Sequence, residues 1–402
     1  MKLVERHIIK ENHPYFKELD HLCFLSKNLY NAGLYAVRQH FFKTGKFLNY
    51  PKLQKSFQQD RNPDYYALPA KVSQQVLMIV ERNFKSFFEA LKVWKLMPFK
   101  FRERPKIPQY KHKAQGRNLL VYTVQAISKT LFRKGLVKLS KTGITIKTRQ
   151  QKVAQARVVP RYGCYIIEII YEKEVTKTKL DKKLYAGVDT GLNNLGAVTS
   201  NKKGFAPFLV NGRPLKSINQ FYNKQKACFQ SLLPKGRRSS KRLQRLTLKR
   251  NCRVDDYLHK ASRIIVDRLV KEGIGNLVIG KNDNWKQSVN MGKRNNQNFV
   301  QVPHARFIEM LTYKAKLEGI KVVVKEEGYT SKCSFLDNES VRKHLFYSGK
   351  RIKRGLFRTA KGLLINADVN ASYNIIKKAA PKAFAEGVEA VVVQPYRYFS
   401  IK

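Results

Sequence analysis

The chain has 402 residues, of which 80 are Lys or Arg and 28 are Asp or Glu, so its formal net charge is +52. This length predicts two or three domains, and 43% hydrophobic residues is enough for real cores. So large a positive charge repels itself unless a polyanion lies beside it, and nucleic acid is the natural candidate because phosphate contacts by Lys and Arg release counterions.

An anionic membrane is the alternative polyanion. No apolar run approaches the roughly 18–20 residues that are needed to span a bilayer. The first residues, 1–13, carry Glu5 inside a short apolar stretch and do not have the layout of a signal peptide. We therefore expect a cytoplasmic, nucleoid-associated protein with no membrane partner.

The five cysteines are scattered through the chain: Cys23, Cys164, Cys228, Cys252 and Cys333. No CxxC pair occurs among them, so neither a disulfide framework nor a zinc ribbon is predicted. We expect reduced, mostly packed cysteines and no structural zinc.

The first half of the chain changes from helical to β-like patterns. Residues 1–11 alternate as a strand does, and apolar residues recur at helical spacing over 14–42 and 68–91. These helices predict a small bundle with one side facing the polyanion. Two prolines within 104–117 end the helical region. We expect a small antiparallel barrel from the β-like runs that follow, at 119–124, 135–139, 143–148 and 164–172.

A charged linker at 173–183 marks a domain boundary, after which the pattern changes. Residues 184–200 read as strand, Gly/Asn turn and strand, which predicts a hairpin. Residues 214–272 are expected to be long and helical. Within them, 235–250 carry eight Lys or Arg in sixteen residues.

The last part of the chain predicts an α/β domain. Strand-like runs at 276–280 and 320–325 flank a helix predicted over 302–319, and this order implies a parallel pair. A polar, basic segment follows at 328–363. Asn366 is then a suitable N-cap for a final helix.

Several acids stand at the ends of these elements. Asp189 ends a strand before a glycine turn, Glu326 and Glu327 end another, and Asp368 lies in the first turn of the last helix. Each has an ordinary explanation, as a turn former, a strand cap or a partner of the helix dipole. Together they predict a converging site, because strand ends and a helix packed on them meet in an α/β fold. Three carboxylates are a sufficient set for Mg²⁺, and two such ions support phosphodiester cleavage.

Several motifs carry a resemblance to a known family. "AGVDTGLNNLGAV" and "NADVNASYNI" resemble the first and third motifs of RuvC-type nuclease domains. "LSKNLYNAGLY", "QQVLMIVERNFKSFFEAL", "GRPLKSINQFYNKQKA" and "YLHKASRIIVDRLV" resemble the transposon-encoded TnpB family. Its members are RNA-guided DNA endonucleases, relatives of type V CRISPR effectors and of Fanzor proteins. The resemblance runs over nearly the whole chain.

The resemblance implies a domain layout and a chemistry. It implies a wedge β-barrel from 1–11 and 104–180, an inserted helical recognition domain over 12–103, and an RNase H-like (RuvC) nuclease domain over 181–402. Residues 328–363 would be a nucleic-acid-binding insertion in the nuclease domain. The implied partners are a guide RNA from the transposon end and double-stranded target DNA, cut beside a short transposon-adjacent motif with Mg²⁺, as two ions.

The first departure from the family concerns the second acid. It usually follows an apolar strand, but here "NLVIGKND" places Gly280 at that position. Asp283, three residues on, reads as a solvated loop acid. Some relatives carry the glutamate two residues before the tyrosine of "YTSK", which is Glu327 here. Because Glu326 and Glu327 lie on opposite faces of a strand, the motif favours Glu327 as the catalytic and metal-binding partner of Asp189 and Asp368.

The second departure concerns zinc. Relatives often carry a four-cysteine ribbon in the 328–363 segment, where this chain has only Cys333 and one histidine, His344. Two such ligands cannot close a tetrahedral site. The segment must therefore hold itself by packing or become ordered on nucleic acid.

The basic run is expected to bind nucleic acid. Charged helices are usually solvated faces, but like charges four residues apart repel unless a partner neutralises them. We predict a phosphate-tracking helix carrying Arg237, Arg238, Lys241, Arg242 and Arg245. Gln74 and Gln75 either read adenine edges or face water, and the sequence does not choose between these. No helix-turn-helix or zinc-finger reader occurs, which fits specificity by guide pairing.

The leading hypothesis is therefore an RNA-guided, Mg²⁺-dependent DNA endonuclease. A guided DNA-binding repressor that has lost cleavage is the alternative that Gly280 suggests, and Glu327 argues against it. A transposase acting by strand transfer would use the same metal chemistry. Such a transposase usually needs a module that binds the transposon ends, and no motif in the sequence indicates one.

Overall fold

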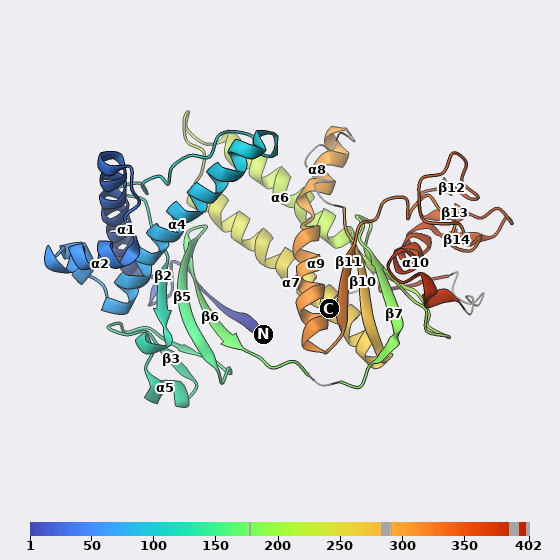
Figure 1. Cartoon of the computed structure of the whole chain (residues 1–402), viewed down its shortest axis with the longest axis horizontal. Helices are drawn as coiled ribbons and strands as arrows, with labels where there is room; N and C mark the ends of the chain where they lie inside the picture. Colours follow the sequence, from blue (N-terminus) through green and yellow to red (C-terminus); the bar gives the residue numbers. More distant parts are fainter. Residues whose placement is uncertain (177, 283–289, 291, 386–393, 399–402) are drawn as a thin grey trace. The chain divides into compact units, whose positions relative to one another are not determined.

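The computed structural model describes residues 1–176, 178–282, 290, 292–385 and 394–398. The chain divides into two compact units, unit 1 (Met1–Lys173) and unit 2 (Glu174–Lys402) (Figure 1). The division lies inside the predicted linker, 173–183. None of the helices in the described ranges is long and apolar enough to cross a membrane.

Unit 1 contains the two predicted long helices and two short ones between them. They are α1 (Phe16–Thr44), α2 (Tyr50–Gln59), α3 (Pro63–Tyr66) and α4 (Ala70–Leu96). The two short helices were not predicted. Each has an Asn at its N-cap and a Pro in its first turn, which are typical signals of a helix start. Helices α1 and α4 pack closely at Gly33, where a Cβ atom would lie 2.9 Å from Leu77 Cδ2.

The strands of unit 1 form an open sheet and a separate ribbon. The antiparallel sheet has the order β1-β6-β5-β2, and β3 pairs with β4 alone. The strands are β1 (Lys2–Ile9), β2 (Leu120–Thr123), β3 (Leu136–Lys138), β4 (Thr145–Lys147), β5 (Val153–Arg161) and β6 (Cys164–Glu172). Short helices η1 (Pro98–Lys100), η2 (Val124–Ala126) and α5 (Lys129–Arg133) complete the unit.

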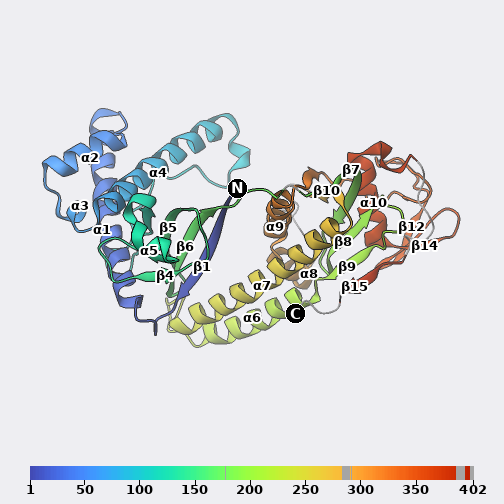
Figure 2. The same cartoon turned by 90° about the horizontal axis from the view of Figure 1, so that it is seen from below.

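The predicted barrel differs from this arrangement. In the described part of unit 1, strand pairing does not close a ring, because β1 and β2 are sheet edges and β3 and β4 pair with each other. The isolated bridge Ile127–Leu139 links the ribbon to the segment after β2. The helices and the sheet share one hydrophobic core, which includes Leu29 and Val76 from the helices and Ile167 from β6 (Figure 2).

Unit 2 is built on a six-stranded mixed sheet in the order β11-β10-β7-β8-β9-β15. The strands are β7 (Asp181–Asp189), β8 (Asn194–Ser200), β9 (Phe208–Asn211), β10 (Ile274–Gly280), β11 (Lys321–Lys325) and β15 (Tyr396–Tyr398). The predicted β7–β8 hairpin is antiparallel, and β10 is parallel to both β7 and β11. This mixed α/β arrangement is consistent with a RuvC-containing fold.

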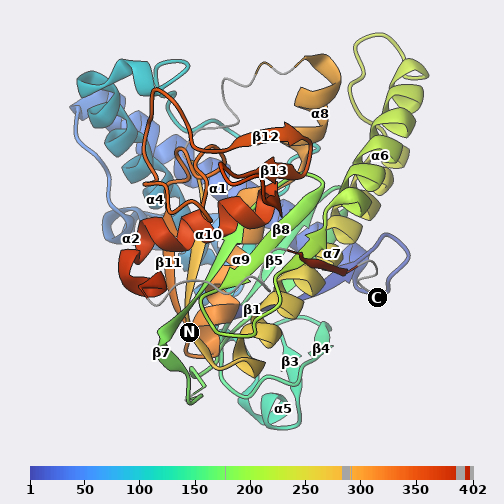
Figure 3. The same ribbon diagram turned by 90° about the vertical axis from the view of Figure 1, so that its right-hand side faces the viewer.

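Helices cover both faces of this sheet. They are α6 (Arg213–Ser231), α7 (Lys241–Lys271), α8 (Lys293–Gln301), α9 (His304–Leu317), α10 (Ala367–Ala379) and the short η3 (Pro381–Phe384). One core joins α7 and α9 to the sheet, and a second core joins α10 to its other face (Figure 3). The helical segment expected over 214–272 is divided into two helices. Pro234 and Gly236, with φ +83°, separate α6 from α7.

The 328–363 segment packs as a small folded insertion against α10. Its strands β12 (Lys350–Lys353) and β13 (Leu356–Arg358) form an antiparallel sheet with β14 (Leu364–Asn366). Phe335 stacks on Tyr373 of α10 with ring centroids 4.6 Å apart. Asn370 also accepts the Phe335 N–H and donates to the Cys333 carbonyl, at 2.9 Å each. These contacts pack the segment against α10.

Candidate active site

Helix α10 brings Asp368 to the end of strand β7, where Asp189 lies. Alternation along β7 turns Ala186 and Val188 toward the α7/α9 core, so Gly187 and Asp189 face α10. A Cβ atom at Gly187 would lie 2.4 Å from the Ser372 carbonyl oxygen, so only glycine permits this close approach of helix and strand.

Asp368 is held in place from three sides. The Asn366 side chain caps α10 by accepting from the Asp368 and Val369 N–H groups at 3.0 and 3.2 Å. Asn194 Nδ2, at the start of β8, donates to Asp368 Oδ2 at 2.7 Å. Arg351 Nη2, from β12 of the insertion, donates to Asp368 Oδ1 at 3.2 Å.

Glu327 occupies the space above Gly280. A Cβ atom at Gly280 would lie 2.6 Å from both Cγ and Oε1 of Glu327 and 2.6 Å from Ile375 Cδ1 of α10. The absence of a side chain at Gly280 thus makes room for the carboxylate that arrives from the neighbouring strand. Asn282 fixes this placement, since its Oδ1 accepts the Glu327 N–H at 3.1 Å.

Glu326 points elsewhere. Its side chain is 64% exposed and pairs with Lys378 Nζ at 2.6 Å. The hydrogen bond from Lys378 lowers the pKa of the Glu326 carboxyl, and the Gly328 N–H adds to the effect. Of the two adjacent glutamates, Glu327 is the one whose charge acts on Asp189, while Glu326 pairs with the last turn of α10. The Asp283 prediction lies outside the described residues.

The three carboxylates influence one another electrostatically. Burial raises the pKa of Asp189 well above its usual value, and the negative charges of Glu327 and Asp368 raise it further, while Arg351 opposes them. Burial, with Glu326 nearby, raises the pKa of Glu327 to about 7. Glu327 Oε1 is buried and has no hydrogen-bond partner. A buried carboxyl oxygen without a partner is a position that a cation could fill.

The donor set suits Mg²⁺, which prefers carboxylate oxygens and keeps several waters. As the side chains stand, no group of three His, Cys, Asp or Glu in the described ranges converges closely enough to hold a metal ion. One reason is visible at Asp368, whose two oxygens are taken by Asn194 and Arg351. Metal binding at this site requires these side chains to rearrange.

Three residues of this site were not predicted: Asn194, Asn282 and Arg351. Asn194 belongs to the "GLNNLG" turn, and Asn282 stands two residues after Gly280, so both positions had a local signal in the sequence. Arg351 had none, because it meets Asp368 only through the folding of the insertion.

The basic run lies on two elements, which corrects the prediction of a single phosphate-tracking helix. Arg237 and Arg238 are exposed in the loop before Ser240, the N-cap of α7. Exposed positions in the first turns of α7 hold Lys241, Arg242 and Arg245. The side chain of Arg242 lies 3.9 Å over the Phe229 ring of α6.

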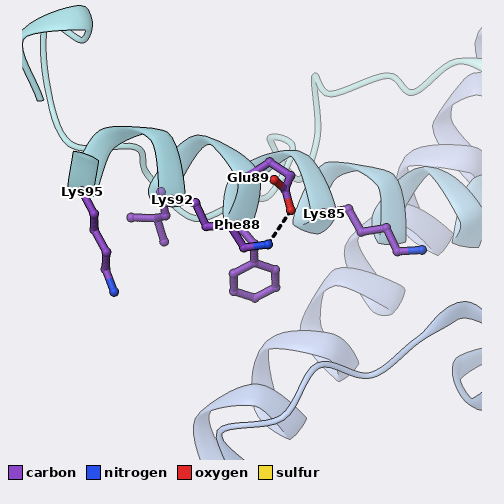
Figure 4. Close-up of a pocket in the computed structure, with 6 residues that line it drawn as sticks. Lys85, Phe88, Glu89, Lys92 and Lys95 are labelled. Atoms are coloured by element: carbon purple, nitrogen blue, oxygen red, sulfur yellow. Dashed lines mark hydrogen bonds and ion pairs between the residues drawn. The ribbon is translucent and has the colours of Figure 1, made fainter. Parts of the chain in front are cut away.

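Two further features lie on α4 in unit 1. Gln74 and Gln75 are half-buried, and Gln75 Nε2 contacts the sulfur of Met78 at 3.4 Å. Nearer the end of α4, an open pocket of about 670 Å³ is lined by Lys85, Phe88, Glu89, Leu91, Lys92 and Lys95 (Figure 4). Its three lysines fit the predicted polyanion-facing side of this helix and offer no catalytic group.

The two residues considered as zinc ligands have other partners. Cys333 is buried and its thiol donates to the Arg342 carbonyl at 3.5 Å. His344 Nε2 donates to the Ser340 carbonyl at 2.7 Å. The absence of structural zinc remains a prediction.

Family models match two segments of the chain, of which the first starts at the end of unit 1 and continues into unit 2, and the second lies within unit 2. Residues 168–286 match the OrfB_IS605 model, described as a probable transposase, and residues 304–375 match the TNB domain of Cas12f1-like proteins. The resemblance to TnpB-like, Cas12f-type proteins is confirmed. The second match contains both Glu327 and Asp368, and the first contains Asp189 and Gly280.

Curated relatives carry the same type of name. The chain is 34% identical over 137 residues to the CRISPR-associated endodeoxyribonuclease Cas12f1 of Sulfoacidibacillus thermotolerans, covering 34% of this chain and 29% of that protein. It is 28% identical over 229 residues to Cas12f2 of Micrarchaeota archaeon (strain CG1_02_47_40), covering 54% of this chain and 40% of that protein. The matched regions thus span less than half of either relative.

A solved structure shares the fold. A cryo-EM structure of a Cas12f1–sgRNA–target DNA complex aligns with a TM-score of 0.54 and 13% identity, over 89% of this chain and 82% of that one. At this identity the match shows the architecture alone.

Proposed function

We propose that this chain is an RNA-guided DNA endonuclease that cuts target DNA by Mg²⁺-dependent phosphodiester hydrolysis. The observation that carries the proposal is the Glu327 carboxylate, which fills the space above Gly280 with a buried, unpartnered oxygen and raises the pKa of Asp189. A protein that had lost cleavage would have no reason to keep a buried acid there.

In this proposal Asp189, Glu327 and Asp368 hold the divalent cations. Bound Mg²⁺ supplies activation of the attacking water and stabilisation of the leaving 3′ oxygen. The chain's own contribution is position: Asn282 orients Glu327, and Asn194 orients Asp368. Arg351 offsets the carboxylate charge in this structure and becomes available for a phosphate once cations take its place.

Guide RNA and target DNA are the proposed partners. The exposed cations at 237–245 would contact phosphates along the duplex, and sequence would be read by base pairing with the guide. The helical recognition domain, the wedge, the transposon-end origin of the guide and the transposon-adjacent motif are parts of the same proposal.

The test is to purify the protein from its host, sequence the RNA that accompanies it, and offer DNA that matches the variable part of that RNA. We expect cleavage that requires Mg²⁺ and is lost in Asp189→Asn and Asp368→Asn, with target binding retained. Binding without cleavage by the unaltered protein would indicate a guided repressor. Joining of DNA ends instead of hydrolysis would indicate a transposase.

A further inference from the structure

The insertion presents two large apolar side chains to solvent at the tip of its 340–349 loop. Leu345 is 94% exposed and Phe346 is 91% exposed, more than any other large apolar side chain in the described ranges. Exposed apolar side chains are ordinary when single, but two adjacent ones at a loop tip indicate a binding partner.

The loop that carries this pair is held rigidly. The His344 ring, bonded to the Ser340 carbonyl at 2.7 Å, meets the Tyr347 ring edge-on with centroids 5.5 Å apart. Beyond the tip, the Ser348 N–H donates to Glu339 Oε1 at 3.0 Å. Because both sides of the tip are fixed, Leu345 and Phe346 are presented in one place, and little ordering cost remains for binding.

The surroundings of the tip are strongly basic. No acid occurs between Glu339 and Asp368. The exposed cations of this stretch are Arg342, Lys343, Lys350, Arg351, Lys353, Arg354, Arg358 and Lys361. An apolar tip within such a surface matches a partner that combines negative charge with flat apolar faces, and unpaired nucleic-acid bases have both.

The tip also lies on the segment that reaches the carboxylates. Phe346 precedes Arg351 by five residues, a chain length of at most about 17 Å, and Arg351 pairs with Asp368. A strand whose phosphate lies at the carboxylates therefore passes within reach of the tip. This continuity favours DNA over an anionic lipid surface, to which the carboxylate site has no relation.

We propose that Leu345 and Phe346 form a stacking platform that holds an unpaired base of the DNA strand entering the carboxylate site. This inference rests on the proposed function and deepens it, by assigning recognition of single-stranded DNA to the tip of the insertion. Phosphates would contact the surrounding cations while a base stacks on Phe346 and packs against Leu345.

The experiment uses the protein with the RNA it carries and a single-stranded oligodeoxynucleotide containing 2-aminopurine at successive positions. Stacking quenches the probe's fluorescence, so the assay reads both affinity and base contact. The variants are Leu345→Ser and Phe346→Ser, with Phe346→Trp to keep an aromatic face. The matched control is Leu363→Ser, because Leu363 is 55% exposed on the same insertion but lies outside the tip.

We expect Phe346→Ser to weaken probe binding about tenfold and to abolish quenching, since stacking contributes about 1–3 kcal/mol per base. Phe346→Trp and Leu363→Ser should behave as the unaltered protein. Unchanged affinity and quenching in both serine variants at the tip would overturn the proposal. So would loss of binding to phosphatidylserine vesicles, or of self-association, in these variants while the DNA probe still binds normally.

This readout is independent of cutting. If Asp189→Asn still cuts while Phe346→Ser loses the probe, the proposed catalytic site fails and the stacking platform stands. If Asp189→Asn abolishes cutting while Phe346→Ser keeps full probe binding, the catalytic site stands and the platform fails.

Discussion

Replacing Gly280 by alanine tests the active site without touching a carboxylate. The added Cβ atom would lie 2.6 Å from Glu327 Cγ, Glu327 Oε1 and Ile375 Cδ1. Carbon atoms pack at about 3.5–4.0 Å, so the Glu327 side chain must move by about 1 Å. A displacement of about 1 Å costs on the order of 10²-fold in rate when a catalytic group depends on position. We therefore expect Gly280→Ala to cut a matched target about 10²-fold more slowly.

The assay is single-turnover cleavage, with target binding and thermal unfolding measured in parallel. Overpacking of this kind costs about 1–3 kcal/mol of stability, so the variant should remain folded at 25 °C. Gly196→Ala is the matched control in the same sheet, because its Cβ atom would meet only ordinary contacts at 3.5 Å or more. Cleavage by Gly280→Ala at the unaltered rate would refute the reasoning.

Substitutions of the acids themselves extend this prediction. Glu327→Ala should lose about 10²–10³-fold in cleavage, the usual effect of removing one electrostatic contact to a transition state. Adding Gly280→Ala to Glu327→Ala should slow cleavage little more, because the acid that the new Cβ atom would displace is already absent and only the contact with Ile375 Cδ1 remains. Glu326→Ala and Asp283→Ala should cut normally, and all variants should bind guide and target. Full cutting by Glu327→Ala with loss in either of the other two would mean that the wrong acid was chosen.

Three further outcomes are expected. The protein should purify with a structured RNA, because a charge of +52 is otherwise unscreened, and a soluble RNA-free preparation at low salt would contradict this. Elemental analysis should find no tightly bound zinc; one zinc per chain would mean that ligands outside 328–363 were missed. Burial lowers the pKa of Lys314 to about 8 from 10.5, so between these values the unfolded state binds more protons and stability rises with pH. Lys314→Met should remove this rise, although it also loses the hydrogen bonds from Lys314 to the His259 carbonyl and Ser262, and urea unfolding at pH 7 and pH 10 would measure the change in slope.

The sequence predicted those elements whose signals are local. Short apolar runs on either side of a Gly/Asn turn located β7 and β8, and the Asn366 cap located the start of α10. The break between α6 and α7 also had a local signal, Pro234 and Gly236, which the helical period on either side concealed. Strand β5 was missed because Pro160 and a weak alternation make Val153–Arg161 a poor strand by itself, and pairing with β6 supplies what the pattern lacks.

Other features depend on tertiary contacts that no window of sequence contains. Closure of the strands in unit 1 depends on which edges meet, and β1 and β2 remain edges of the sheet in the described residues. The Arg351–Asp368 pair exists only because the insertion folds back onto α10. Strand alternation could predict that Glu326 and Glu327 point in opposite directions. It could not predict the ion-pair partner of Glu326, because Lys378 lies on another element.

Gly280 and Glu327 are best understood as one structural feature. In the parallel register Gly280 lies opposite Lys325, two residues before Glu327, so both positions open onto the same edge of the sheet. A glutamate at each would place two carboxylates in one volume, where a Cβ atom already comes within 2.6 Å of Glu327 Oε1. Two like charges this close cannot both ionise. The Glu327 side chain therefore leaves room only for a very small residue at 280, and glycine meets that requirement.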